Sequence, residues 1–128
     1  MNRRILLIED NEENRYLATF LLETHGWKIV HAADGPLALT TAAGIAPALI
    51  LLDIQLPGMD GYAVARALRS QPALDGVPII AVTSYAMPGD RERCMAAGCN
   101  GYIEKPIDPD TFVRDIETFA PGTRGDAA

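Results

Sequence analysis

Long apolar runs and an excess of basic residues are both missing from this sequence of 128 residues. No apolar segment approaches the roughly 20 residues that a helix needs to cross a bilayer. The basic N-terminus is followed by too short an apolar run for a signal peptide. Eleven Lys and Arg residues stand against 17 Asp and Glu residues, for a formal net charge of −6. This charge argues against binding to nucleic acids, because such surfaces need clustered basic side chains. Without a membrane-spanning segment or a signal peptide, we expect a cytoplasmic protein that does not bind membranes.

Cysteine and histidine are scarce as well. Cys94 and Cys99 are accompanied by neither a C-x-x-C motif nor a histidine at metal-binding spacing. We interpret them as buried thiols in a reducing compartment. His25 and His31 flank Trp27 and are far in sequence from the acidic residues described below, so we interpret them as loop or strand-edge residues rather than ligands.

The sequence does contain a regular alternation of short apolar runs and amphipathic segments. Its length suits one domain, and its hydrophobic fraction of 48% is ordinary for a globular protein. We assign residues 1–120 to this domain and expect the Gly- and Ala-rich residues 121–128 to be a disordered tail. Strands are predicted at Arg4–Ile8, Lys28–Ala32, Ala48–Leu52, Ile79–Val82 and Gly101–Glu104.

Apolar stripes and end signals predict a helix after each strand. Asp10 or Asn11 is expected to cap the first helix and Asp60 the third. A proline starts the second helix and Gly44 is expected to end it. The predicted helices are Asn11–Thr24, Pro36–Ala43, Tyr62–Ser70, Asp90–Ala97 and a last one that starts at Asp108-Pro109 and reaches Phe119 or Ala120.

This alternation favours a parallel sheet with right-handed crossovers. Five strand–helix units are too few for a closed eight-stranded barrel. We therefore predict an open, doubly wound α/β fold, whose ligand site lies beyond the carboxyl ends of its strands.

Polar side chains stand at the carboxyl ends of four predicted strands. Glu9 and Asp10 follow the first, Asp53 the third, Thr83 the fourth and Lys105 the fifth. Crowded carboxylates raise one another's pKa, and Mg²⁺ relieves this while taking up a substrate phosphate oxygen. A carboxylate there can form an aspartyl phosphate, with the cation and the lysine neutralising charge and the threonine hydroxyl binding a phosphoryl oxygen. The pattern predicts a Mg²⁺-dependent phosphoryl-transfer site.

Four motifs at these strand ends resemble the receiver domain of two-component response regulators. The resemblance extends from Arg4 to about Phe119, and in particular to receivers of the DivK type and of hybrid histidine kinases. It implies a CheY-like, flavodoxin-like (βα)5 fold with strand order 2-1-3-4-5. The motifs are Ile-Glu-Asp-Asn-Glu at 8–12, Leu-Leu-Asp-Ile-Gln-Leu-Pro-Gly-Met-Asp-Gly at 51–61, Ala-Val-Thr-Ser at 81–84 and Gly-Tyr-Ile-Glu-Lys-Pro-Ile at 101–107.

The resemblance also implies a role for each residue of the acidic site. Asp53 would be the phosphoacceptor. Asp10 would bind Mg²⁺ directly and Glu9 through a metal-bound water, while the backbone carbonyl of Gln55 would be a further ligand. Gln55 and Tyr85 occupy positions that tune the lifetime of the aspartyl phosphate in the family.

On the phosphoryl side, the resemblance assigns contacts to Thr83 and Lys105. The peptide between Lys105 and Pro106 would be cis, which proline tolerates far better than other residues do. Tyr102 would be an aromatic switch residue that turns inward as Thr83 moves towards the phosphoryl group.

The resulting hypothesis is a single-domain response regulator. It would accept a phosphoryl group from a phosphohistidine of a sensor histidine kinase or a histidine phosphotransfer protein. It would catalyse only its own phosphorylation and dephosphorylation, act as a monomer and switch its contacts with a downstream target protein. A receiver domain cut from a hybrid histidine kinase is the alternative.

Three other classes fit the residues less well. An aspartate-nucleophile phosphatase usually has a second Asp two residues after the nucleophile, where this chain has Gln55, which cannot titrate. A receiver-like binding module without phosphorylation would be expected to lack a site residue, and none is missing. A flavin site needs a Ser-, Thr- or Gly-rich phosphate loop where residues 9–12 are acidic.

Overall fold

The computed structural model describes residues 2–56, 58–84 and 87–120. The proposed tail at 121–128 and Tyr85 lie outside these residues. Strands and helices alternate along the chain, as the sequence predicts. They are β1 (Arg4–Ile8), α1 (Glu12–Thr24), β2 (Lys28–Ala32), α2 (Gly35–Ile45), β3 (Leu49–Asp53), α3 (Gly61–Arg69), the 3₁₀ helix η1 (Pro72–Leu74), β4 (Ile79–Thr83), α4 (Asp90–Ala96), β5 (Gly101–Glu104) and α5 (Phe112–Glu117).

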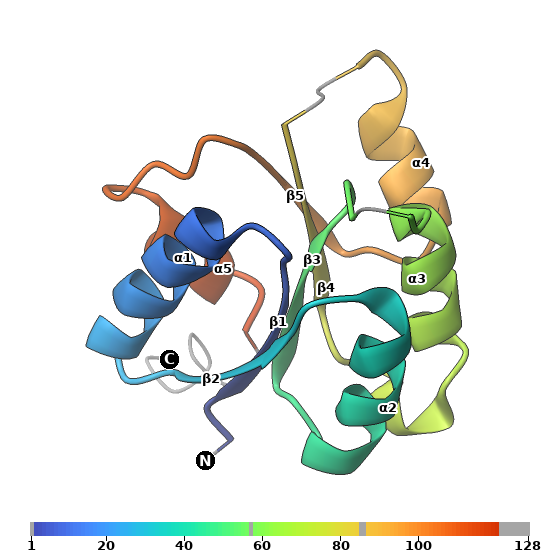
Figure 1. The fold of residues 1–128 in the computed structure, drawn as a ribbon, viewed down its shortest axis with the longest axis horizontal. Helices are drawn as coiled ribbons and strands as arrows, with labels where there is room; N and C mark the ends of the chain where they lie inside the picture. Colours follow the sequence, from blue (N-terminus) through green and yellow to red (C-terminus); the bar gives the residue numbers. More distant parts are fainter. Residues whose placement is uncertain (1, 57, 85–86, 121–128) are drawn as a thin grey trace.

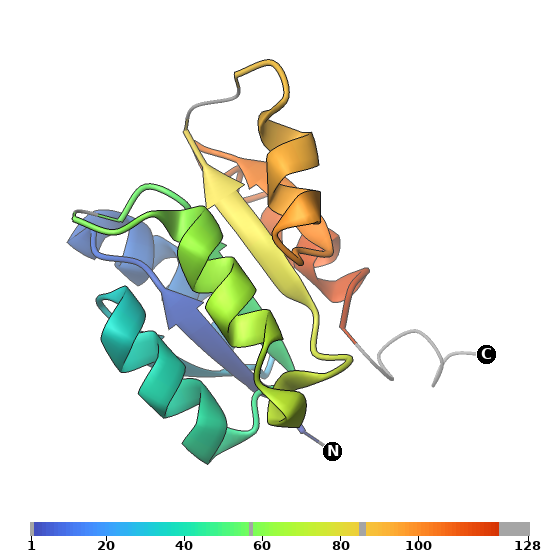
Figure 2. The ribbon, with the colours of Figure 1, turned by 90° about the vertical axis from the view of Figure 1, so that its right-hand side faces the viewer.

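The five strands form one parallel sheet in the order β2-β1-β3-β4-β5, which confirms the predicted topology. Helices α1 and α5 cover one face, and α2, α3 and α4 cover the other (Figures 1 and 2). Strands β1, β3 and β4 are buried along almost their whole length, because a central parallel strand is covered on both faces. None of the helices in the described part of the chain is long and apolar enough to cross a bilayer.

Local signals explain most helix starts. The side chains of Asn11, Asp34 and Asp60 accept hydrogen bonds from backbone N–H groups in the first turns of α1, α2 and α3, as capping residues do. The two capping predictions for the first and third helices are therefore confirmed. Cys94 and Cys99 are buried free thiols, and His31 lies in the edge strand β2, as expected.

Two local predictions are wrong, and one element was not predicted. Helix α2 continues through Gly44 to Ile45 and ends at Ala46, which adopts a left-handed conformation with φ 50°. The last helix begins at Phe112 rather than at Asp108-Pro109. The Asp108 carbonyl accepts the N–H groups of Thr111 and Phe112, so Asp108 opens a separate turn before the helix. The sequence interpretation also missed η1.

Gly61, the first residue of α3, lies directly against the backbone of Ile54. A Cβ atom at this position would overlap the carbonyl oxygen and the Cα atom of Ile54. We expect Gly61→Ala to lower the free energy of unfolding by about 3 kcal/mol, because the new methyl group meets backbone that cannot rotate away. Gly44→Ala is the matched control, since nothing lies within 4 Å of the added atom; it should gain about 1 kcal/mol from helix propensity. Urea unfolding measures both, and equal stabilities of the two variants would contradict this account of Gly61.

Candidate metal and phosphoryl-transfer site

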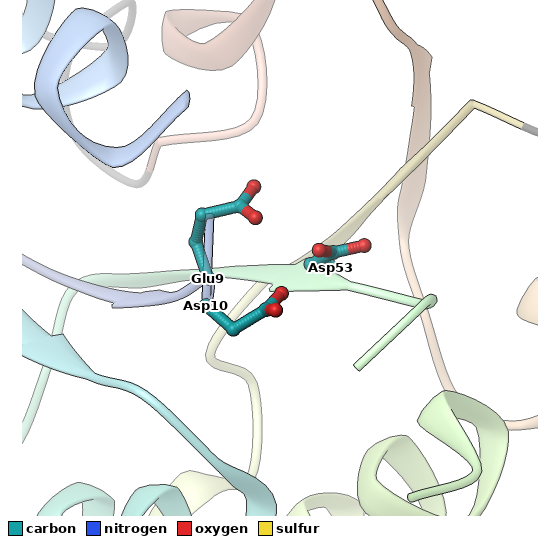
Figure 3. Close-up of side chains that lie close together, drawn as sticks. All are labelled: Glu9, Asp10 and Asp53. Carbon is teal, nitrogen blue, oxygen red and sulfur yellow. The ribbon is translucent and has the colours of Figure 1, made fainter. Parts of the chain in front are cut away.

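The sheet brings Glu9, Asp10 and Asp53 together at its carboxyl edge (Figure 3). Strands β1 and β3 are neighbours in which Ile8 pairs with Leu52, so the residues that follow this pair are adjacent. The three side chains each offer one carboxylate oxygen within 4.8 Å of the others. Glu9 and Asp53 are 4% and 3% exposed, whereas Asp10 is exposed. The edge thus combines two buried carboxylates with one that faces solvent.

Lys105 forms ion pairs with both buried carboxylates. Its Nζ lies 3.1 Å from Oε1 of Glu9 and 3.2 Å from Oδ2 of Asp53. Its backbone N–H donates to the carbonyl of Thr83, which fixes the end of β5 beside the end of β4. The Lys105–Pro106 peptide is cis, as the family resemblance implies. The ammonium carries one positive charge, so it cannot balance both carboxylates.

The pKa of Glu9 reflects both its burial and the charges beside it. Burial, together with the neighbouring Asp53 carboxylate, raises this pKa from 4.5 to about 7, although Lys105 acts in the opposite direction. Asn11 also donates its backbone N–H to Oε2 of Glu9. A second cation at this edge would therefore relieve an existing repulsion.

Asp53 is held by the loop that follows it. Its Oδ1 accepts the backbone N–H of Gln55. The side-chain amide of Gln55 then donates to Oγ1 of Thr83 at 3.0 Å and accepts from both the N–H and the hydroxyl of Ser84. The family resemblance gave Gln55 a backbone carbonyl role and a position that tunes the lifetime of the aspartyl phosphate, but it did not predict that the side chain connects the ends of β3 and β4.

The site lies in an open depression of about 700 Å³, enough for a hydrated cation and a phosphoryl group. Thr83 is buried next to this depression, and its hydroxyl accepts a hydrogen bond from Gln55, which lines it. The depression is lined by Glu9, Asp10, Asn11, Asn14, Asp53, Gln55, Ser84, Lys105 and Pro106.

A family model described as "Response regulator receiver domain" matches residues 5–117. The chain belongs to the receiver-domain family. Receiver domains of two-component signalling form a family of phosphoacceptors rather than of classical enzymes.

Individual relatives agree with the family match. The polar-differentiation response regulator DivK of Brucella ovis is 40% identical over 119 residues, which make up 93% of this chain and 97% of that protein. The chemotaxis protein CheY4 of Vibrio cholerae is 26% identical with a TM-score of 0.88, over 93% of this chain and 99% of that one. The receiver domain of a sensor histidine kinase from Pseudomonas aeruginosa is 37% identical with a TM-score of 0.83, over 93% and 98%, and has a magnesium ion coordinated in its active-site cleft.

The residues of this receiver fit the Mg²⁺ that such domains bind. Hard oxygen ligands from one or two carboxylates are what Mg²⁺ prefers, and Glu9, Asp10 and Asp53 converge at the edge of the sheet. After burial, the neighbouring Asp53 carboxylate is the main cause of the raised pKa of Glu9, so negative charges repel one another at the same place. The chemistry of the donor set therefore matches a divalent cation.

The Glu9 carboxyl leads to a prediction about pH. Because its pKa is raised to about 7 in the folded receiver, cation binding must displace a proton below that pH. We expect Mg²⁺ affinity to rise about tenfold per pH unit below pH 7 and to level off above it. In the metal-free receiver the same shift contributes stability that is complete below pH 4.5 and is lost as the pH rises through about 7.

Calorimetric titration of Mg²⁺ across this pH range measures the effect, with Glu9→Gln as the matched variant. The variant should show a much flatter pH dependence, because glutamine does not titrate. An equally steep dependence in Glu9→Gln would show that another group releases the proton.

The structure places the remaining predicted residue, Tyr102, on β5. Its ring is half-buried, and its hydroxyl donates to Oδ2 of Asp90 at 2.8 Å. Asp90 is itself buried. Sequence reasoning treated Asp90 only as the first residue of a helix and gave no sign of this contact, because a carboxylate in a first helical turn is usually solvated.

Proposed function

We propose that this receiver accepts a phosphoryl group on Asp53 in a Mg²⁺-dependent reaction. The donor is a phosphohistidine of a sensor histidine kinase or of a histidine phosphotransfer protein. The observation that supports this most strongly is the position of Asp53, a buried carboxylate that contacts the Lys105 ammonium and lies beside two further carboxylates. Phosphorylation then changes the contacts of the receiver with a downstream target protein.

The proposed reaction needs little covalent chemistry from the protein. A carboxylate oxygen of Asp53 forms the new P–O bond, and the P–N bond breaks with its electron pair returning to the imidazole of the donor. Lys105 neutralises charge on the transferring group, and the Thr83 hydroxyl donates a hydrogen bond to it. Asp10, Asp53 and the Gln55 carbonyl would hold the Mg²⁺, with Glu9 acting through water, and the cation would supply the remaining charge neutralisation.

The proposed output is a change in protein contacts. A phosphoryl group adds about −1.5 to −2 charge at the sheet edge, next to Thr83. We propose that Thr83 and Tyr102 transmit this change to the surface formed by α4, β5 and α5.

The proposed setting is a monomeric single-domain regulator in the cytoplasm. The match over 97% of the length of DivK supports a single-domain regulator. The phosphatase alternative gains no support from the site, because the Gln55 amide is already bonded to Thr83 and Ser84.

Incubation with acetyl phosphate and Mg²⁺, followed by intact-mass analysis, tests the proposal. We expect one phosphoryl adduct that maps to the peptide containing Asp53 and does not form when EDTA removes the cation. The absence of an adduct with Mg²⁺ present, or its location on another residue, would overturn the assignment.

A further inference from the structure

A buried carboxylate joins three elements on the face of the sheet covered by α3 and α4. Asp90 is the first residue of α4 and is only 7% exposed. Its Oδ2 accepts the hydroxyl of Tyr102 from β5, and its Oδ1 accepts the hydroxyl of Tyr62 from α3. Both oxygens of one charged group are thus bonded to donors on two other elements.

Each tyrosine also contacts an arginine of α4. The guanidinium carbon of Arg93 lies 4.2 Å from the centre of the Tyr62 ring, and that of Arg91 lies 5.9 Å from the centre of the Tyr102 ring. Burial and the nearby Asp90 raise the pKa of Tyr62 to about 12 and also raise that of Tyr102. Both hydroxyls therefore keep their protons and remain donors.

This junction lies next to the phosphoacceptor. Tyr62 and Asp90 line the same hollow as Gln55 and Thr83, and Gln55 bonds both to Asp53 and to Thr83. Helix α3 starts at the end of the loop that follows Asp53, and α4 follows β4. A change at Gln55 or Thr83 therefore reaches the junction through the hollow that they share with Tyr62 and Asp90.

Sharing one carboxylate makes the two tyrosines dependent on each other. If the Tyr102 ring turns inward, Oδ2 of Asp90 loses its donor. If Asp90 follows Tyr102, Oδ1 loses the Tyr62 hydroxyl instead. Because a buried carboxylate that lacks a partner is costly, neither ring moves without affecting the other.

We propose that Asp90 is a positioning residue of the switch, which couples Tyr62 on α3 to Tyr102 on β5 and stabilises the arrangement of the unphosphorylated receiver. This inference rests on the proposed phosphorylation of Asp53. It extends the expected pair of Thr83 and Tyr102 by two residues, and it brings α3 into the response.

NMR spectra of the protein with ¹³C-labelled tyrosine rings test the coupling directly. The sequence has four tyrosines, so single Tyr→Phe variants assign the signals. In the native receiver, the Tyr62 and Tyr102 signals should shift together as acetyl phosphate and Mg²⁺ phosphorylate it. Tyr62→Phe, which removes only a hydroxyl, should move the Tyr102 signal of the unphosphorylated protein towards its phosphorylated position. It should also raise the phosphorylation rate about fivefold, as the loss of one hydrogen bond predicts.

Three variants separate coupling from a purely structural effect. Tyr16→Phe is the matched control, because Tyr16 is exposed on α1. This substitution should change neither the Tyr102 signal nor the phosphorylation rate. Asp90→Ala should displace both tyrosine signals, while Asp90→Asn, which can still bond to both hydroxyls, should largely restore them.

The coupling is overturned if Tyr62→Phe leaves the Tyr102 signal and the phosphorylation rate unchanged, or if phosphorylation shifts Tyr102 alone. Either result would come from a protein that carries the adduct, so it would leave the proposed function standing. No adduct on the native protein would instead overturn the proposed function and the coupling with it.

Discussion

Asparagine at position 53 is expected to abolish formation of the phosphoryl adduct while leaving the fold at least as stable. The amide oxygen of Asp53→Asn can still accept the Gln55 N–H that now bonds to Oδ1. The amide lacks the negative charge that makes the carboxylate a nucleophile. Removing that charge also ends the repulsion that helps to raise the pKa of Glu9. Intact-mass analysis after treatment with acetyl phosphate and Mg²⁺ measures the adduct, and thermal unfolding measures stability.

The matched control is Asp75→Asn, an exposed aspartate after η1 and away from the site. It should be phosphorylated at the native rate. An adduct on Asp53→Asn, in the same yield as on the control, would show that another residue is the phosphoacceptor.

Methionine at position 105 is expected to slow phosphorylation and to strengthen Mg²⁺ binding. Lys105 is the cation that contacts Asp53, so its loss removes a charge that stabilises the transferring phosphoryl group. The expected decrease in rate is about 100-fold or more, the usual effect of deleting one electrostatic contact to a transition state. Mg²⁺ affinity should rise, because the ammonium that now pairs with Glu9 and Asp53 no longer competes with the metal.

The opposite directions of the two effects make the Lys105→Met experiment informative. A misfolded site would weaken both phosphorylation and metal binding, whereas removal of a single charge should separate them. Lys28→Met replaces the only other lysine of the sequence, which is exposed on β2, and should change neither. A rate within threefold of native in Lys105→Met would exclude the role proposed for the ammonium.

The carboxyl edge of the sheet was predictable because the rules of parallel sheets are strict. An apolar run such as Leu49–Leu52 identifies a strand covered on both faces, and its following residue must lie at the ligand edge. Repeating that argument over several strands places Glu9, Asp53 and Lys105 together, as the structure confirms. The position of each residue at the end of its strand was enough to predict that these side chains converge, without knowledge of side-chain rotamers.

Contacts between loops could not be predicted in the same way. The Gln55 amide reaches Ser84, and Asp90 joins Tyr62 to Tyr102. These pairs depend on side-chain rotamers and on how far α4 sits from α3, neither of which leaves a periodic signal in the sequence. The end of α2 was missed for a related reason: Gly44 is a common helix terminator, yet the chain leaves the helix two residues later through Ala46.

The position of Lys105 also has a consequence for how the chain folds. In the sheet, β3 and β4 lie between β1, which leads to Glu9, and β5, which leads to Lys105. During synthesis the acidic ends of β1 and β3 emerge long before the ammonium that pairs with them. An intermediate without β5 therefore contains a stronger repulsion between these carboxylates than the native state, in which Lys105 offsets part of it. Docking of the last strand brings in the ammonium that pairs with Glu9 and Asp53, so the phosphoryl-transfer site gains its lysine in the same step that completes the sheet.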